Sequence, residues 1–349
     1  MNFVIQSMQR TLQKGRYMAT TVITAFNEFL QNSVNLDPED TKAARLDRDN
    51  LRTRIQGLET TVDYFPYLYT DADINYGSFS RRTKKRPLDD VDMFFCLMAQ
   101  GATYNDYDPN NITLTLTDTS SRLYQYTKDD NRTISSIKIL NKFKSSLTNI
   151  YHYRSAEINR RQEVVLLNLV NKDWSFDIVP CFLTVEQFGK NFYIIPNGSG
   201  DWKKADPRID KNRTITINQQ NNGNLLDVIR TVKFWNSRAT MHTMGSYLLE
   251  NIILNYYQHR TDCSQFVDMS LPAIFNHISS AVYQYVADPK GFQGDLNTLS
   301  FEQKVSISAR ASLDYQKAGE ARRLETEKDH KGSINKWREI FGNEFPTYG

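Results

Sequence analysis

The hydrophobic pattern of this chain changes from a strand type to a helix type near residue 205. Before that point, short runs rich in β-branched and aromatic residues are separated by polar turns, as in a sheet. After it, apolar residues recur at helical spacing, as in helices that bury one face. The strand-type runs are 74–76, 91–98, 112–116, 137–139, 164–170 and 175–179. We therefore predict an α+β protein, with a mixed β-sheet followed by a helical carboxyl-terminal domain.

Helical periodicity also precedes the strands. Residues 1–33 predict one long amphipathic helix or two in succession, and residues 41–58 predict a further helix after Pro38. A loop at 197–211, rich in Gly, Asn, Asp and Pro, leads into the second half of the chain. The other predicted helices are 133–151, 224–238, 246–260, 271–286 and 301–327. We expect two domains, 1–215 with the amino-terminal helices and 216–349.

Charge and cysteine content exclude several classes of protein. The formal net charge is only +3, so a site for phosphate groups requires a local cluster of basic residues. Residues 1–16 lack the continuous apolar stretch of a signal peptide, and no apolar run is long enough to span a membrane. The cysteines are too widely spaced for a zinc motif or a disulfide framework: Cys96, Cys181 and Cys263. We expect a cytoplasmic protein without a membrane segment.

The segment from Gly77 to Asp92 contains two features suited to phosphate chemistry. Asp90 and Asp92 alternate with Val91 at strand period, so both carboxylates lie on one face of the predicted strand. Neighbouring carboxylates repel each other unless a cation lies between them, and Mg²⁺ commonly binds carboxylates together with substrate phosphates. Gly77 and Ser78 follow an apolar run, where a glycine lets backbone N–H groups approach a phosphate chain. Each motif alone is common in structural turns, but their order and spacing favour nucleotidyl transfer.

These residues resemble the active-site signature of the polymerase β-like nucleotidyltransferases, and more narrowly that of the cGAS/DncV-like nucleotidyltransferases (CD-NTases) of bacterial anti-phage systems. The clearest match is Arg86–Asp92, which follows Gly-Ser and a basic loop as in that family. Other stretches resemble the strand of the third metal carboxylate, the Pro-Gly-Trp loop, the helices that bind the donor triphosphate, and the closing segment. In the same order, these stretches are Trp174–Pro180, Ile195–Trp202 with Asp206–Pro207, Ile229–Asn236 with Ser246, and Lys336–Gly342 with Phe345–Pro346.

The resemblance implies a polymerase β-like nucleotidyltransferase core and two Mg²⁺ ions, or Mn²⁺ in their place. It assigns both metal binding and catalysis to Asp90, Asp92 and Asp177. It assigns the binding of nucleoside triphosphates (ATP, GTP or others) to Gly77, Ser78, Lys233 and Ser246. The implied reaction releases pyrophosphate and forms a cyclic di- or trinucleotide second messenger, which a downstream effector receives in anti-phage (CBASS) signalling.

Two other functions share this pattern. A nucleotidyltransferase can act on RNA ends or on protein side chains, and a non-catalytic scaffold can keep the fold alone. An RNA-tailing enzyme typically has an extended basic surface, whereas the basic run 81–86 is short and lies inside the motif. Stable binding of duplex nucleic acid is therefore not expected. The complete set of three aspartates argues against the scaffold.

Two positions stand apart from the common pattern. Arg82 occupies a place where many members of the family have Gly, and it is either a solvated loop residue or a contact for a phosphate or a partner.

Gly349 ends the chain shortly after Pro346. A terminal glycine suits ubiquitin-like ligation enzymes, which join some members of the family to cellular targets, because it has no Cβ to crowd the reacting carboxyl group. The alternative is an ordinary chain end without a function of its own.

Overall fold

The computed structural model describes residues 18–349. The segment compared above with a signal peptide and the first part of the predicted amino-terminal helix lie outside the described residues. Within them, the first helix is α2 (Val22–Phe29), which continues as a π-helix over Leu30–Val34. The helix predicted at 41–58 is confirmed as α3 (Pro38–Gln56), followed by the short α4 (Leu58–Thr61). Over residues 18–349, no helix combines the length and the apolar character needed to cross a membrane.

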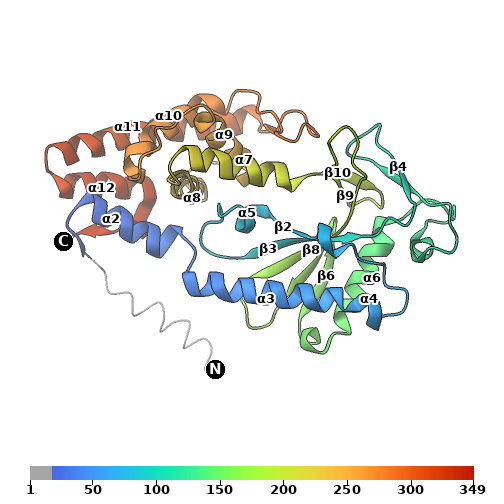
Figure 1. Cartoon of the computed structure of the whole chain (residues 1–349). Coiled ribbons are helices and arrows are strands. Elements are labelled where there is room, and N and C mark those ends of the chain that lie inside the picture. The colour runs from blue at the N-terminus through green and yellow to red at the C-terminus, as the bar shows by residue number, and fades with distance from the viewer. Residues whose placement is uncertain (1–17) are drawn as a thin grey trace.

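A seven-stranded mixed sheet forms the centre of one half of the molecule (Figure 1). Its two longest strands, β3 (Asp90–Leu97) and β8 (Ser175–Leu183), are parallel neighbours, and the other pairings in this sheet are antiparallel. On one side, β3 pairs with β2 (Ile74–Tyr76). On the other, β8 pairs with β7 (Val164–Asn168) and then with β9 (Tyr193–Pro196). The edges are completed by β6 (Glu157–Arg161) beside β7 and β10 (Trp202–Ala205) beside β9.

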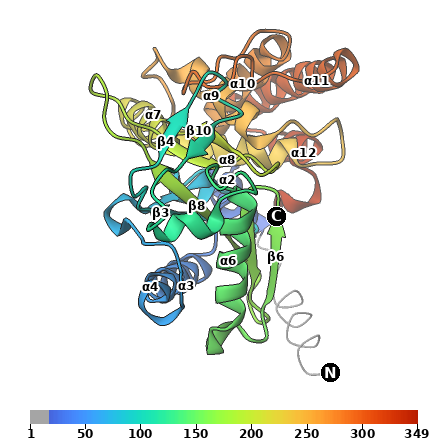
Figure 2. The ribbon, with the colours of Figure 1, turned by 90° about the vertical axis from the view of Figure 1, so that its right-hand side faces the viewer.

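Helices cover one face of this sheet. The apolar residues of α3 and of α6 (Ser136–Thr148) pack with the buried side chains that β3 and β8 turn toward them. Both helices lie below β3 and β8 in Figure 2. The opposite face has a smaller apolar cluster, which includes Phe94, Cys96 and Cys181. A separate hairpin, β4 (Thr103–Asn105) with β5 (Thr113–Thr115), lies beyond the end of the sheet (Figure 1).

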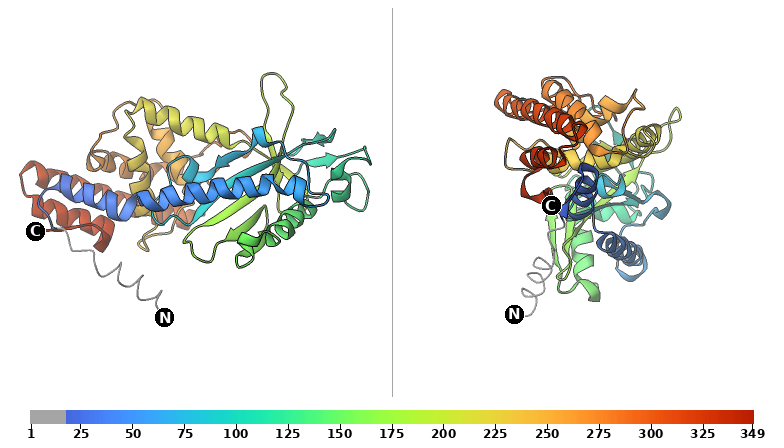
Figure 3. Two further views of the ribbon diagram at one scale, coloured as in Figure 1. Left: turned by 60° about the horizontal axis from the view of Figure 1, so that its bottom comes forward. Right: turned by 90° about the vertical axis from the view of Figure 1, so that its left-hand side faces the viewer.

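The second half of the chain forms a helical core. Its helices are α7 (Pro207–Gln220), α8 (Leu225–Asn236), α9 (Ser246–Tyr257), α10 (Val267–Ala281), α11 (Phe301–Thr326) and α12 (His330–Phe341). Helix α2 joins this core: the ring of Phe26 lies 5.0 Å from that of Trp337 and 4.9 Å from that of Phe345. Figure 3 shows α2 and α3 following one another along both halves. The amino-terminal helices therefore contribute to both cores, and the domain boundary at residue 215 stays a prediction.

Two local predictions were wrong. The strand predicted at 137–139 is part of α6, because the Ser135 hydroxyl caps the backbone N–H of Lys138 and apolar residues follow at helical spacing. The predicted loop at 197–211 contains β10 and the first turn of α7. The start of that helix has clear local causes, since the Asp206 carboxylate accepts from the backbone N–H of Arg208 and Pro207 occupies the first helical position. The predicted α+β class, with a mixed sheet and a helical second half, is confirmed.

Candidate active site

The predicted catalytic aspartates meet at the start of the two parallel strands. Asp90 and Asp92 alternate on β3 with Val91, which is buried in the core shared with α3 and α6. Asp177 lies on β8 directly opposite Asp92 in the register of the sheet. Opposite residues of neighbouring strands point to the same face, so the three carboxylates share the face turned away from α3 and α6.

Gly77 brings the other half of the motif against these carboxylates. It is the first residue of α5 (Gly77–Ser80), immediately after β2, and its φ of +71° lies in the left-handed region. A Cβ at this position would lie 1.8 Å from Oδ2 of Asp92. Any side chain at residue 77 would therefore displace the carboxylate, and the conformation itself also favours glycine.

Burial and nearby negative charge raise the pKa values of Asp92 and Asp177. Burial, together with the charges of Asp90 and Asp177, raises the pKa of Asp92 to about 8. The pKa of Asp177 is raised by burial and then by Asp90. The ammonium group of Lys84 contacts the carboxylates of Asp89 and Asp90 and offsets part of this negative charge. Because the charge of Asp90 still raises the pKa values of both Asp92 and Asp177, the offset is incomplete, and this face attracts additional positive charge.

A pocket of about 490 Å³ opens beside the carboxylates. Asp90 and Asp177 line it from the parallel strands, and residues 161–164 line it from the hairpin of β6 and β7. Among residues 18–349, no three His, Cys, Asp or Glu side chains form a preassembled metal-ligand set. The residues present nevertheless fit a hard divalent cation, because three oxygen donors share one strand face with negative charge that the chain leaves unbalanced.

A second buried carboxylate fastens the loop that follows α5. Glu250 of α9 accepts hydrogen bonds from Arg81 Nε at 2.7 Å, from Thr83 Oγ1 at 2.9 Å and from Lys233 Nζ at 2.7 Å. We call these four residues the Glu250 clasp. Only 2% of the Glu250 side chain and 5% of the Lys233 side chain are exposed. Burial alone would raise the pKa of Glu250, but Lys233 and Arg81 outweigh it and lower the pKa to about 2.

The clasp also determines the position of Ser78. The backbone N–H groups of Thr83 and Lys84 donate to the Ser78 carbonyl at 2.9 and 3.1 Å. Lys233 of α8 donates from Nζ to the Thr83 carbonyl at 3.2 Å. The loop thus closes on itself and is held to α8 and α9. The position of the predicted phosphate-binding serine therefore depends on the helical half of the chain.

The predicted triphosphate residues come from three different elements. Ser78 lies on α5, where Gly77 contacts Asp92. Lys233 is buried on α8, with its ammonium group divided between Glu250 and the Thr83 carbonyl. Ser246 is exposed as the first residue of α9, four residues before Glu250. The structure brings the Gly77 motif and the three aspartates into one site and links Lys233 to that site through the loop. It leaves Ser246 exposed at the start of α9, where, among the residues that the structure describes, its hydroxyl forms no hydrogen bond to the rest of the site.

Sequence analysis did not identify Glu250 or Thr83, and it considered Arg81 and Lys84 only as members of the basic run 81–86. One pattern could have indicated Glu250, because it is the only acidic residue in the largely apolar run 248–254 of a predicted helix. A charged residue on a buried helix face requires an ionic partner. Its partners Arg81 and Thr83 are remote in sequence, and no local pattern could have identified them.

Known proteins resemble this chain along most of its length. It is 43% identical over 333 residues to a probable cyclic nucleotide synthase of Bacillus cereus (strain VD146), covering 95% of this chain and 99% of that protein. No family model matches the chain. Escherichia coli MS115-1 CdnC, solved with ATP, has a TM-score of 0.65 at 15% identity and covers 92% of this chain and 98% of its own. Vibrio cholerae DncV cyclic AMP-GMP synthase, solved with a linear intermediate, has a TM-score of 0.63 at 13% identity, with coverages of 92% and 97%.

The structural comparisons establish the fold of the chain, and the sequence comparison establishes its family. At identities of 13–15%, the similarity to CdnC and DncV shows a common fold, which is the predicted polymerase β-like nucleotidyltransferase fold with a mixed sheet and added helices. The 43% identity to the Bacillus cereus synthase extends over nearly all of both chains. With the fold, this identity shows that the chain belongs to the CD-NTase family of nucleotidyltransferases, the cyclic nucleotide synthases.

Proposed function

We propose that this protein condenses ribonucleoside triphosphates into a cyclic di- or trinucleotide and releases pyrophosphate. The observation that carries the proposal is the register of β3 and β8, which sets Asp177 opposite Asp92 on the face that also carries Asp90. The substrates of the structural relatives support ribonucleotides such as ATP and GTP. CdnC was solved with ATP, and DncV was solved with the linear intermediate 5′-pppA(3′,5′)pG.

Each residue of the site has a proposed role. Asp90, Asp92 and Asp177 would hold two Mg²⁺ or Mn²⁺ ions, which when bound neutralise the triphosphate and lower the pKa of the acceptor hydroxyl. The lack of a side chain at Gly77 lets the Asp92 carboxylate lie against the backbone at the start of α5. The Ser78 hydroxyl and the neighbouring backbone N–H groups contact the donor phosphates. Two residues of the helical half, Lys233 and Ser246, provide the remaining contacts to the donor triphosphate.

The proposed reaction requires no covalent enzyme intermediate. Asp177 orients the acceptor ribose hydroxyl and accepts its proton. In-line attack on the α-phosphorus of the donor forms the new phosphodiester bond and breaks the bond to pyrophosphate. Positioning and neutralisation of charge supply most of the acceleration in transfers of this kind. A second round in the same pocket closes the ring.

The proposed biological setting is anti-phage signalling in the cytoplasm, in which a downstream effector receives the cyclic nucleotide. CdnC was also solved as a complex with HORMA-ΔN. That complex supports the expectation that this chain has a protein partner as well as a nucleotide product.

Attachment of the terminal carboxyl group to another protein is a separate proposal. The last strand, β11 (Thr347–Tyr348), pairs in parallel with β1 (Met18–Ala19), and the Gly349 N–H donates to the Ala19 carbonyl at 3.4 Å. Ligation at Gly349 therefore requires these strands to separate so that the tail becomes extended and free. The pairing is only two residues long on each side, and a contact of this size opens at little cost.

A product assay tests the main proposal. The purified protein is incubated with all four labelled ribonucleoside triphosphates and Mg²⁺ or Mn²⁺, beside the variant Asp90→Ala/Asp92→Ala and the control Asp173→Ala, whose side chain is exposed. A phosphatase-resistant product with a cyclic mass, made by the wild type and the control alone, supports the proposal. Labelled RNA or protein favours the other transferases, and the absence of any product favours the scaffold. Synthesis by the double variant at the wild-type rate contradicts the assigned carboxylates.

A further inference from the structure

Arg82, in the loop after α5, has a strained backbone conformation that the proposed reaction does not explain. Its φ of +62° lies in the left-handed region, which costs energy for a residue with a side chain. Neighbouring groups hold it there: Nη1 of Arg230 on α8 donates to the Arg82 carbonyl, and Nε of Arg230 donates to the Asn35 side chain at 2.7 Å. A strained residue that is held in this way commonly belongs to a functional site.

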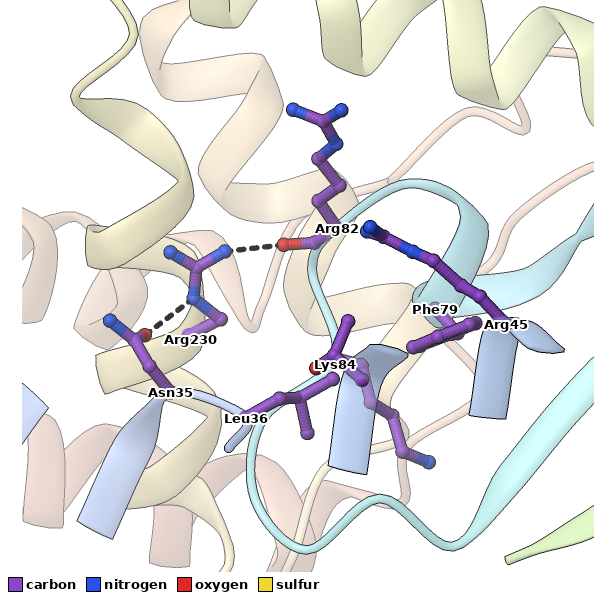
Figure 4. Close-up of a pocket in the computed structure, with 8 residues that line it drawn as sticks. Asn35, Leu36, Arg45, Phe79, Arg82, Lys84 and Arg230 are labelled. Carbon is purple, nitrogen blue, oxygen red and sulfur yellow. Dashed lines mark hydrogen bonds between the residues drawn. The ribbon is translucent and has the colours of Figure 1, made fainter. Parts of the chain in front are cut away.

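The side chain of Arg82 lines a pocket of about 400 Å³ between the loop, α8 and the start of α3 (Figure 4). Three more cationic side chains line the same pocket: Arg45, Lys84 and Arg230. Leu36 and Phe79 contribute an apolar wall. Figure 4 shows Arg45 extending from α3 toward the loop that carries Arg82. Two separate elements therefore direct cations into one space.

The positive charge of this pocket is only partly balanced. Arg230 and Lys84 have acidic partners outside the pocket lining. Within the described part of the chain, Arg45 and Arg82 form no ion pair, and no Asp or Glu lines the pocket. Guanidinium groups that face a common space repel each other, and an anion between them replaces that repulsion with charge-assisted hydrogen bonds.

We infer that this pocket binds a small organic polyanion, a molecule with two or more phosphate or carboxylate groups and an apolar body. The planar guanidinium groups of Arg45 and Arg82 match either oxyanion, and Phe79 with Leu36 contacts the apolar part. A volume of about 400 Å³ suits a ligand of this size.

The polyanion pocket is distinct from the pocket beside the carboxylates. Asp90 and Asp177 line the latter and are absent from the former. Lys84 connects the two, since it lines the polyanion pocket while its ammonium group contacts Asp90. A ligand in the polyanion pocket therefore lies next to a residue that contacts the proposed active site.

Titration calorimetry on the full-length protein tests the inference, with inorganic tripolyphosphate and citrate as probes, in EDTA and without nucleotide. Arg45→Gln and Arg82→Gly each remove one charge from the pocket. Lys42→Gln is the matched control, because it removes one charge from an exposed position of α3 that does not line the pocket. We expect at least one probe to bind, both pocket variants to weaken it about tenfold, and the control to leave it unchanged. Stronger binding of tripolyphosphate identifies a phosphate ligand, and stronger binding of citrate a carboxylate ligand.

Arg82→Gly also separates ligand binding from stability. Glycine relieves the left-handed strain, so the melting temperature should stay equal or rise while the affinity falls. The inference is overturned if neither probe binds at millimolar concentration, or if both pocket variants bind like the wild type. Nucleotide and metal are absent from this titration, so failure to form a cyclic product would contradict the proposed function and leave this test unaffected.

Discussion

Asp92 and Glu250 are both carboxylates removed from water, yet their surroundings have opposite effects. Asp92 is crowded by Asp90 and Asp177, and its pKa is raised to about 8. Glu250 is bound by Arg81 and Lys233, and its pKa is lowered to about 2. Burial raises the pKa of both groups, so the neighbouring charges account for the difference. A carboxylate among like charges needs a cation from outside the chain, whereas one among cations is already satisfied, which distinguishes the candidate site from the clasp that fastens it.

The largest expected effect follows the removal of one carboxylate from the crowded face. Asp92→Asn should reduce nucleotide condensation at least about 10³-fold, equivalent to about 4 kcal/mol in the barrier, since a metal ligand is lost. The same change should stabilise the metal-free protein by ~1–3 kcal/mol at neutral pH, because the buried carboxyl group no longer has to take up a proton when the chain folds. Product analysis and thermal unfolding in EDTA measure the two effects. The control is Asp173→Asn, at an exposed aspartate. Condensation within tenfold of the wild-type rate, or a lower melting temperature, would refute the proposal that the crowded carboxylates bind the metal ions.

Removing the carboxylate of the Glu250 clasp should lower the stability of the protein, whereas Asp92→Asn should raise it. Glu250→Ala leaves Arg81 and Lys233 buried without their partner, so the free energy of unfolding should fall by about 3–5 kcal/mol. Urea denaturation measures this loss. Glu186→Ala, at an exposed glutamate, should change stability by no more than about 0.5 kcal/mol. A loss from Glu250→Ala that is no larger than the loss from the control would mean that the ion pairs do not stabilise the loop.

Acid should weaken the clasp. The folded-state pKa of Glu250, about 2, is below its ordinary value of 4.5. Its ionised form therefore contributes stability that is fully present above pH 4.5 and is lost as the pH falls toward 2. The slope should approach about 1.4 kcal/mol per pH unit in that window, and Glu250→Gln should lack this contribution. Unfolding free energies between about pH 5 and 3 test it, and identical slopes in both proteins would contradict it.

Lys233 lies between the two regions and should show a mixed effect. Lys233→Ala is expected to raise the apparent KM for nucleotide about tenfold, because a point charge near the donor triphosphate is lost. It should also reduce stability, since Glu250 loses a partner at 2.7 Å. Steady-state kinetics beside denaturation separate the effects, with Lys190→Ala at an exposed lysine as the control. An unchanged KM with reduced stability would confine Lys233 to the clasp.

The smallest effect is expected from the chain end. Deleting Thr347–Gly349 removes only the two-residue strand pair with β1 and the glycine after it. Stability should fall by no more than about 1 kcal/mol, and condensation by the purified enzyme should stay within about twofold of the wild type. If condensation collapses instead, the tail belongs to the fold or the active site, and the proposed attachment at Gly349 loses its basis.

Local patterns predicted elements where one face of the element is buried. Helix α3 and strands β3 and β8 were predicted because their apolar residues follow one period. Helix α7 was missed because only Thr214 and Ile217 are buried along it, which leaves little hydrophobic periodicity. Residues 137–139 were assigned to a strand because a short apolar run fits both periods, and the packing of α6 on the sheet decides between them.

The sequence by itself determined the local part of the site. The alternation of Asp90, Val91 and Asp92 places two carboxylates on one strand face wherever that strand lies, and Gly77 permits the left-handed turn. Tertiary structure decided which distant residues meet them. Asp177 stands opposite Asp92 only through the register of parallel strands, and Glu250 reaches Thr83 only because α9 packs over the loop. Backbone geometry acts over a few residues, whereas strand register and helix packing depend on which buried faces of the whole chain fit together.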